Sequence, residues 1–260
     1  MQVAYEVELK AAKQAALEAG KIILEVYFED VEVILKNDDT PVTRADYASN
    51  AYILDRLIHE FPHHGFLSEE STDNLIRLEK DYCWIIDPLD GTKEFIKKNG
   101  EFTINIALVK GHDVVMGVVY APVKEELYYA VRGEGAFMEK DGEVSRIHVS
   151  DRLVDLYALR SRSHETIRYA ELLARHSERI LVIHRMGSAY KGCLIARGDY
   201  DIYYNFGHTM VWDTAPVDLI VSEAGGYFRQ LDHTGFLYNT KRIKNDKGFL
   251  ILNRPENRLE

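Results

Sequence analysis

Cysteine is scarce in this sequence, with only Cys83 and Cys193 among its 260 residues. Two isolated cysteines provide neither a disulfide framework nor the paired spacing of a cysteine zinc site. We therefore expect reduced, buried thiols in a cytosolic protein. Long apolar runs are also missing: none approaches the roughly 20 residues that a transmembrane helix needs. The first residues carry acids early and lack the apolar run of a secretory signal.

Positive charge is in deficit as well. The 32 Lys and Arg residues face 42 Asp and Glu residues, which gives a formal net charge of −10. Without a surplus of Lys and Arg to neutralise phosphates, the charge argues against broad binding to nucleic-acid polymers or anionic membranes. A small phosphorylated ligand stays compatible with this charge, because a bound metal can supply the local positive charge. The chain is long enough for one large domain or two compact lobes.

Hydrophobic periodicity predicts helices and antiparallel strands in the first half of the chain. A helix is expected over residues 3–28. A second helix should run from Thr43 to about His59, because Thr43 and Asp46 form a capping pattern and Pro62 follows. Residues 37–41 are rich in turn formers. Apolar runs predict a strand ending before Asp87 and then a meander over residues 102–109, 114–120, 126–131 and 135–138.

From about residue 146 the pattern changes to alternating strands and helices. Strands are expected at 157–159, 180–183, 201–204 and 249–252, and helices at 166–176, 189–197 and 214–224. Such alternation is typical of α/β folds. The sequence thus predicts an N-terminal α+β lobe, residues 1–145, and a C-terminal α/β lobe, residues 146–260, which would complete the site.

Candidate metal- and phosphate-binding groups are concentrated in residues 87–95, Asp-Pro-Leu-Asp-Gly-Thr-Lys-Glu-Phe. Asp87 and Asp90 supply two carboxylates, and Gly91 and Thr92 would offer N–H groups at the start of a helix expected over residues 93–98. Magnesium prefers several hard oxygen ligands and is often bound together with substrate phosphates. The motif therefore predicts a divalent cation held together with a phosphate.

Other segments supply the remaining oxygens. Glu69 and Asp213 lie at the ends of expected strands or helices, and the carbonyl of Leu89 is a further ligand candidate. Two such ions can activate water and stabilise the leaving oxygen of an in-line displacement. Thr92 would orient the attacking water, with Asp46 or Glu69 taking its proton.

Each of these acids alone also has a structural interpretation. Asp46 could simply cap its helix, and Asp213 could do the same before Thr214. Glu70, beside Glu69, fits a solvated neighbour better than a ligand. What favours a site is that the acids accompany the rare hexapeptide Asp87–Thr92.

That hexapeptide, with Ser68-Glu69-Glu70 upstream and Trp212-Asp213 downstream, resembles the signature of the inositol monophosphatase superfamily, whose members are lithium-sensitive, magnesium-dependent phosphomonoesterases. The resemblance covers most of the chain, from Pro41 to Gly226, and implies a layered αβαβα sandwich of α/β (α+β) class. It also implies that two or three Mg²⁺ ions bind, with no covalent phosphoenzyme. The implied metal ligands are Glu69, Asp87, Leu89, Asp90 and Asp213, and the implied catalytic residues are Asp46, Glu69 and Thr92.

Within the superfamily, residues 97–108, 118–123 and 161–164 resemble bacterial 3′(2′),5′-bisphosphate nucleotidases. This implies hydrolysis of 3′-phosphoadenosine 5′-phosphate to AMP and phosphate, which would clear a by-product of sulfate assimilation. His164, Ser188 and Lys191 lie in segments that resemble the nucleotide-binding ones. The full set of implied substrate contacts is Glu69, Leu89, Asp90, Gly91, Thr92, His164, Ser188, Lys191 and Asp213.

Two positions depart from the nucleotidase pattern. Asn205 stands where those enzymes tend to carry a basic residue, and Gly192 stands where an aromatic residue commonly follows the lysine. Both changes fall in the expected nucleotide pocket. An inositol monophosphatase or a fructose-1,6-bisphosphatase of the same superfamily is therefore the alternative.

A different class of function is a non-catalytic metal- or phosphate-binding protein on the same scaffold. Thr92 argues against it, because binding alone does not need a residue that positions water. The expected partner is a small phosphorylated substrate, with no nucleic-acid polymer and no integral membrane segment. The resemblance is compatible with a monomer or a homodimer. We expect a cytoplasmic protein and leave peripheral association with the inner membrane open.

Overall fold

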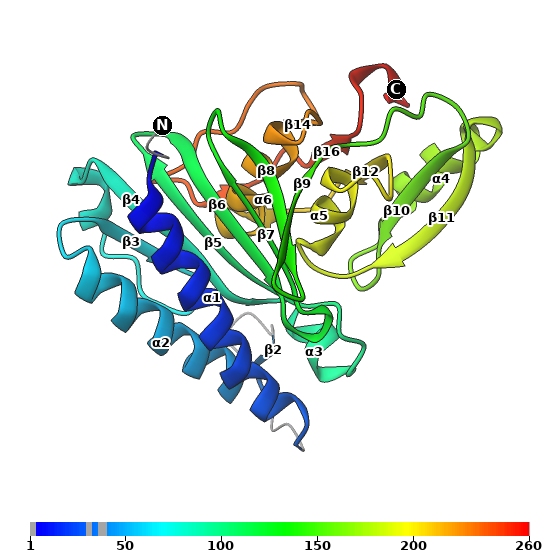
Figure 1. Cartoon of the computed structure of the whole chain (residues 1–260). Helices are drawn as coiled ribbons and strands as arrows, with labels where there is room; N and C mark the ends of the chain where they lie inside the picture. The colour runs from blue at the N-terminus through cyan, green and yellow to red at the C-terminus, as the bar shows by residue number, and fades with distance from the viewer. Residues whose placement is uncertain (1–3, 30–32, 36–40, 260) are drawn as a thin grey trace.

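The computed structural model describes residues 4–29, 33–35 and 41–259, which form five alternating layers of helix and sheet (Figure 1). Helices α1 (Glu6–Tyr27) and α2 (Arg44–Glu60) cover one face of a seven-stranded sheet. Helices α5 (Tyr190–Ala196) and α6 (Val211–Glu223) lie between that sheet and a five-stranded sheet. Helix α4 (Ile167–Arg175) forms the fifth layer. The layered αβαβα fold expected from the sequence is confirmed.

The first two helices form as their sequence pattern predicts. Helix α1 turns a stripe of buried alanines, including Ala12, Ala15 and Ala19, toward the sheet. Helix α2 begins with the expected capping box: the Asp46 carboxylate accepts the Thr43 N–H at 2.7 Å, and the Thr43 hydroxyl accepts the Ala45 N–H at 3.2 Å. The turn expected over residues 37–41 lies outside the described residues, apart from Pro41.

The seven-stranded sheet has the order β3-β4-β5-β6-β7-β8-β9 and is antiparallel except for the parallel pair β3 and β4. The predicted meander is confirmed in its central strands. Strands β3 and β9 were not predicted: β3 has only four residues, and β9 is exposed along most of its length and so lacks an apolar pattern. The strands are β3 Gly65–Ser68, β4 Tyr82–Asp90, β5 Thr103–Lys110, β6 Asp113–Ala121, β7 Glu126–Val131, β8 Gly135–Lys140 and β9 Glu143–Ile147.

The five-stranded sheet has the order β11-β10-β12-β16-β14. Its strands are β10 Leu156–Ser161, β11 Ile180–Met186, β12 Ile202–Asn205, β14 Tyr227–Gln230 and β16 Phe249–Leu252. From β10 the chain passes through α4 to β11, at the edge of the sheet. It then returns through α5 to β12, on the other side of β10. Because parallel crossovers are right-handed, this reversal puts α4 and α5 on opposite faces of the sheet. All strands of this sheet except β14 had been predicted.

Two small ladders complete the structure, β1 (Val33–Leu35) with β2 (Pro41–Thr43) and β13 (Thr209–Met210) with β15 (Lys244–Asn245).

The boundaries of two predicted helices near the site were wrong by one to three residues. Helix α6 begins at Val211 rather than Thr214, so Asp213 lies in its first turn, where the carboxylate accepts the Met210 N–H at 2.7 Å. Helix α3 (Thr92–Ile96) begins one residue earlier than predicted and ends two residues earlier, with Gly91 as its N-cap residue. The residue at which a helix begins or ends depends on how its terminal N–H and C=O groups are capped, which hydrophobic periodicity does not show.

Hydrophobic packing does not divide the chain at one residue. One buried cluster joins α1 and α2 to the seven-stranded sheet, and a second contains residues of both sheets together with α4, α5 and α6. Strand β9 ends at Ile147 and the second sheet begins at Leu156. The two-lobe division at residues 145 and 146 stays a prediction. Within the described ranges, no helix combines the length and the apolar character that a membrane crossing requires.

Candidate metal and phosphate site

The two aspartates of the central motif share one face of β4 because the strand bulges between them. In a regular strand, side chains three residues apart point to opposite faces. Here Asp87 pairs with Asn105, and Asp90 pairs with Thr103, so one extra residue of β4 is inserted between the pairs. A bulge of this kind redirects the following side chain. Asp87 and Asp90 therefore both point to the side of the sheet that α5 and α6 cover.

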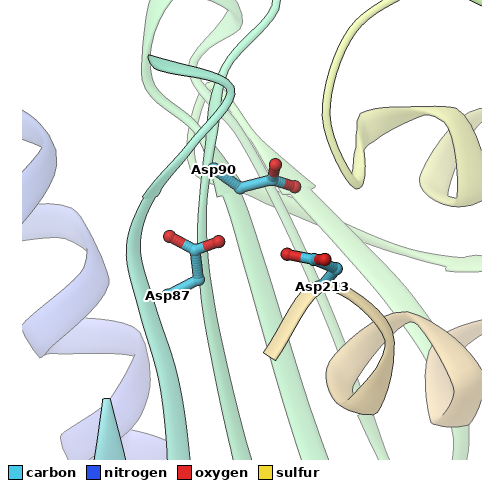
Figure 2. Close-up of side chains that lie close together, drawn as sticks. All are labelled: Asp87, Asp90 and Asp213. Carbon is cyan, nitrogen blue, oxygen red and sulfur yellow. The ribbon is translucent and has the colours of Figure 1, made fainter. Parts of the chain in front are cut away.

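Asp213 completes a cluster of three carboxylates. One carboxylate oxygen from each of Asp87, Asp90 and Asp213 lies within 4.8 Å of the others, and Figure 2 shows the three side chains pointing toward one another. Asp87 is buried, whereas Asp90 and Asp213 are partly exposed to a cavity. Hard carboxylate oxygens at this spacing can hold a divalent cation.

The electrostatics of the cluster favour the binding of a cation. Burial raises the pKa of Asp87 well above its usual range, and the charges of Glu69, Asp90 and Asp213 raise it further. Burial and then the charge of Asp90 do the same to the pKa of Asp213. Burial also raises the pKa of Asp90, although Lys191 and the Ala189 N–H act against that rise. A bound cation would stabilise the ionised form of all three.

Glu69 and Leu89 line the same cavity as the aspartates. Glu69 follows β3, and its backbone N–H donates to the Ile86 carbonyl at 3.2 Å, which fixes this residue beside the end of β4. Leu89 lies within the bulge, next to the Pro88 carbonyl that accepts the Ser49 hydroxyl at 2.8 Å. The structure thus places Glu69, Asp87, Leu89, Asp90 and Asp213 around one end of the cavity.

Thr92 and Asp46 are brought together across the edge of the site. The Thr92 hydroxyl donates to Asp46 Oδ1 at 3.1 Å. The other oxygen, Asp46 Oδ2, accepts the Thr43 N–H and the Thr43 hydroxyl at 2.7 and 2.6 Å. Asp46 therefore caps its helix and holds Thr92 at the same time. Burial raises the pKa of the Asp46 carboxyl, partly offset by these hydrogen bonds.

The cavity has a volume of about 650 Å³ and extends from the acids to the C-terminal residues singled out from the sequence. Gly91 and Thr92 line it together with the acids, and so do His164, Ser188 and Lys191. The buried Lys191 ammonium donates to the Ser188 carbonyl at 2.6 Å. This volume lies within the usual range for small-molecule sites.

Lys93 is a cavity residue to which sequence analysis gave no separate role. Its ammonium lies 2.9 Å from His164 Nε2, so a residue of α3 meets the loop that follows β10. Burial lowers the pKa of His164, and the nearby ammonium of Lys93 lowers it further. An ammonium has no acceptor, so it donates to a neutral imidazole whose proton is on Nδ1.

Polar residues of β5 support the acids and were also missed. Asn105 Nδ2 donates to Asp90 Oδ2 at 3.2 Å, and the Thr103 hydroxyl donates to Asn105 Oδ1 at 2.9 Å. The signal was present in the sequence, because Thr103 and Asn105 place two polar side chains on one face of an otherwise apolar strand. Buried polar groups of this kind need partners.

The two departures noted in the sequence have local explanations. A Cβ atom at Gly192 would lie 2.1 Å from Val217 Cγ1, so α5 packs too closely on α6 for a larger residue. Asn205 ends β12 and lines the cavity, and its side-chain oxygen accepts the Gly207 N–H at 2.7 Å.

Comparison with known proteins places this architecture in a family. Residues 4–254 match the inositol monophosphatase family. The chain is 41% identical over 249 residues to the 3′(2′),5′-bisphosphate nucleotidase CysQ of Salmonella typhimurium, covering 94% of this chain and 98% of that protein. The CysQ protein of Escherichia coli K12 is 39% identical over 241 residues, covering 92% and 96% of the two chains.

Solved structures agree. The crystal structure of CysQ from Bacteroides thetaiotaomicron, a bacterial member of the inositol monophosphatase family, superposes with a TM-score of 0.83 at 36% identity, covering 97% of this chain and 100% of that chain. An IMPase from Thermotoga maritima gives a TM-score of 0.81 at 27% identity, covering 95% and 92%. This chain belongs to the inositol monophosphatase family.

Proposed function

We propose that this protein is a Mg²⁺-dependent phosphatase that removes the 3′-phosphate of 3′-phosphoadenosine 5′-phosphate and gives AMP and phosphate. The observation that carries the proposal is the carboxylate cluster, which lines the same cavity as Lys93, His164 and Lys191. Relatives named 3′(2′),5′-bisphosphate nucleotidase, about two fifths identical over nearly their whole length, support the same substrate class.

The proposed metal ligands are the side chains of Glu69, Asp87, Asp90 and Asp213 and the carbonyl of Leu89. These are all oxygen donors, and no thiol or imidazole belongs to the set, which suits Mg²⁺ better than zinc. We propose two or three ions, because four carboxylates carry more negative charge than one divalent cation balances. Bound there, Mg²⁺ would neutralise phosphate charge and lower the pKa of water.

The protein's own part in the reaction is to hold and deprotonate the attacking water. The Thr92 hydroxyl donates to Asp46, so its oxygen lone pairs are available to accept a hydrogen bond from water. As the water attacks phosphorus, one of its protons passes to the Thr92 oxygen while the Thr92 proton passes to Asp46. The bond from phosphorus to the ribose 3′-oxygen breaks, and that oxygen takes a proton from solvent and leaves as the hydroxyl of AMP. The raised pKa of Asp46 makes this carboxylate a better base. Glu69 is the alternative base.

The second phosphate would be recognised by the basic residues that line the cavity. Lys93 and Lys191 bring two ammonium groups to the cavity, and neutral His164 offers its Nδ1–H as a further donor. Ser188 adds a hydroxyl to the same cavity. Charge-assisted hydrogen bonds to phosphate are among the stronger polar contacts. A substrate with two phosphates matches a cavity whose lining holds both carboxylates for metal and basic side chains for a second phosphate.

The second candidate is a phosphatase for inositol or fructose phosphates. Asn205 favours it, because a neutral amide that already accepts the Gly207 N–H lines the cavity where nucleotidases tend to carry a basic residue. Gly192 removes an aromatic surface from the same wall. Both changes reduce the contacts available to a nucleotide.

A substrate panel separates the two candidates. Phosphate release with Mg²⁺ would be measured on 3′-phosphoadenosine 5′-phosphate, 5′-AMP, inositol 1-phosphate and fructose 1,6-bisphosphate. A large kcat/KM preference for the bisphosphorylated nucleotide, with no activity on AMP, is the expected result. Comparable or higher rates on the inositol or fructose phosphates would instead support the second candidate. A monomeric or homodimeric state and a cytoplasmic location stay predictions.

A further inference from the structure

Glu101 is a buried acid outside the carboxylate cluster, and it joins residues from both halves of the chain. Its side chain lies just before β5 and is 10% exposed. Arg162, in the loop after β10, donates to both of its oxygens, from Nε and Nη2, each at 2.6 Å. Side-on arginine–carboxylate pairs of this geometry fix orientation as well as charge. Arg162 also donates from Nη2 to the Arg185 carbonyl at 2.7 Å, near the end of β11.

The same carboxylate holds the loop between β11 and α5. The Gly187 N–H donates to Glu101 Oε2 at 2.9 Å. A Cβ atom at Gly187 would lie 2.5 Å from Glu94 Cγ and 2.6 Å from the Glu101 carbonyl oxygen, so the loop backbone is packed directly against this segment. The loop has little freedom to shift while Glu101 stays in place.

Two residues further on, this loop reaches the carboxylate cluster. The Ala189 N–H donates to Asp90 Oδ2 at 2.6 Å. The Asn105 amide donates to the same oxygen. Among the residues that the structure describes, the hydrogen bonds to the Asp90 carboxylate all reach Oδ2, which leaves Oδ1 for a ligand. The loop also carries the Ser188 carbonyl that holds the Lys191 ammonium.

We propose that Glu101 is a positioning residue for Asp90. It fixes Gly187, the rigid turn from Gly187 to Ala189 then aims the Ala189 N–H at Asp90 Oδ2, and that bond sets the rotamer that presents Oδ1 to a metal ion. Groups that orient metal ligands from behind in this way typically change metal affinity by 10- to 100-fold when they are removed. The inference rests on the proposed metal site and adds a residue to it.

The test is Glu101→Gln with Mg²⁺ binding measured by calorimetry. Glutamine has nearly the same shape but loses the charge and one acceptor, so at least one of the three N–H donors, Arg162 Nε, Arg162 Nη2 or Gly187 N, loses its partner and meets an amide N–H instead. We expect the Kd for Mg²⁺ to rise by about 10- to 100-fold and the Mg²⁺ concentration for half-maximal phosphatase activity to rise in parallel.

Asp201→Asn is the matched control. The Asp201 carboxylate is fully buried and, like Glu101, accepts an arginine (Arg152, 2.8 Å) and a backbone N–H (Tyr157, 2.7 Å). It precedes β12, at the end opposite Asn205, and does not line the cavity. We expect a lower Tm in this variant with the Kd for Mg²⁺ within twofold of wild type.

Each outcome of these measurements tests either the positioning role of Glu101 or the metal site. A lower Tm for Glu101→Gln with an unchanged Kd would overturn the positioning role and leave a purely structural ion pair. If Glu101→Gln does not fold, Arg162→Lys keeps the charge but loses the two-point geometry, and an unchanged Kd there would overturn the proposal equally. Calorimetry uses no substrate, so a substrate panel that favours inositol phosphates would leave this test intact. Failure of the wild type to bind Mg²⁺ would overturn the metal site and the positioning role together.

Discussion

Replacing Asp213 with asparagine should stabilise the metal-free protein while abolishing its response to Mg²⁺. The Asp213 carboxylate accepts the Met210 N–H at the start of α6, and the side-chain oxygen of asparagine can accept the same bond. The local structure of the helix start is therefore retained. What the substitution removes is a negative charge from a crowded cluster of carboxylates.

The magnitude follows from the spacing of the carboxylates. Oxygens of the three aspartates lie within 4.8 Å of one another. At an effective dielectric constant of about 20, two unit charges at that distance repel by roughly 3 kcal/mol. Removing Asp213 removes two such repulsions, but proton uptake by the cluster already relieves most of them. We expect a net gain of about 2 kcal/mol without metal, which raises Tm by roughly 5 °C for a chain of this size.

The pH dependence has a definite sign. Free aspartates have a pKa near 3.9, and burial raises the pKa of Asp87 and Asp213 well above that in the folded protein. Between the two values the folded state binds more protons than the unfolded state, so metal-free stability falls as pH rises above about 4. The fall ends once the raised pKa values are passed. It should be shallower in Asp213→Asn, which has one fewer acid to protonate.

Thermal unfolding in EDTA and in Mg²⁺, from pH 5 to 8, measures both effects. Asp218→Asn is the control, because Asp218 lies on the same helix outside the cluster, where burial raises its pKa to about 6. That variant should keep the Mg²⁺-induced rise in Tm, whereas Asp213→Asn should lose it along with phosphatase activity. An Asp213→Asn protein that melts below wild type in EDTA, or that is still stabilised by Mg²⁺, would refute the reasoning.

Further predictions concern the water, the second phosphate and competing ions. Thr92→Ala should lower kcat by about 10²- to 10⁴-fold with the calorimetric Kd for Mg²⁺ unchanged, and a weakened Kd would show that Thr92 supports the metal instead. Lys93→Met should raise KM for 3′-phosphoadenosine 5′-phosphate by about 10- to 100-fold through loss of a charge-assisted bond. An equal loss on a substrate with a single phosphate would contradict that assignment. Lithium and excess Ca²⁺ should inhibit phosphate release, Ca²⁺ because its longer and looser coordination misplaces the water, and full rates with both present would count against the metal assignment.

The sequence predicted those parts of the fold whose pattern is long and local. Helices α1 and α2 and the central strands of the meander have sustained periodicity, and each was located within a few residues. Strands β3 and β14 pair with β4 and β16. They are as short as β12 and β16, which were predicted, but their sequences, Gly-Phe-Leu-Ser and Tyr-Phe-Arg-Gln, lack a continuous apolar run.

The site was predictable as a list of residues but not as a geometry. Asp87 and Asp90 are three apart, and regular strand spacing would have put them on opposite faces. Only the inserted residue, which appears in the pairing of β4 with β5, brings them together. Glu101 and Arg162 have no spacing relationship at all, because their contact depends on how the two sheets pack around α5 and α6. Polar residues that only hold other site residues in place do not form a recognisable sequence motif.

From the sequence, capping a helix and serving the site are alternative roles for an acid. In the structure, the same carboxylate can do both. Asp46 Oδ2 accepts the Thr43 N–H while Oδ1 accepts the Thr92 hydroxyl. Asp213 and Asp87 likewise use one oxygen for a nearby backbone N–H, of Met210 and Leu89. A carboxylate has two oxygens, so the bond that satisfies the backbone also fixes the rotamer that aims the other oxygen. Capping geometry is in this way a means of orienting the proposed ligands, and it explains why the acids occur at helix starts and strand ends.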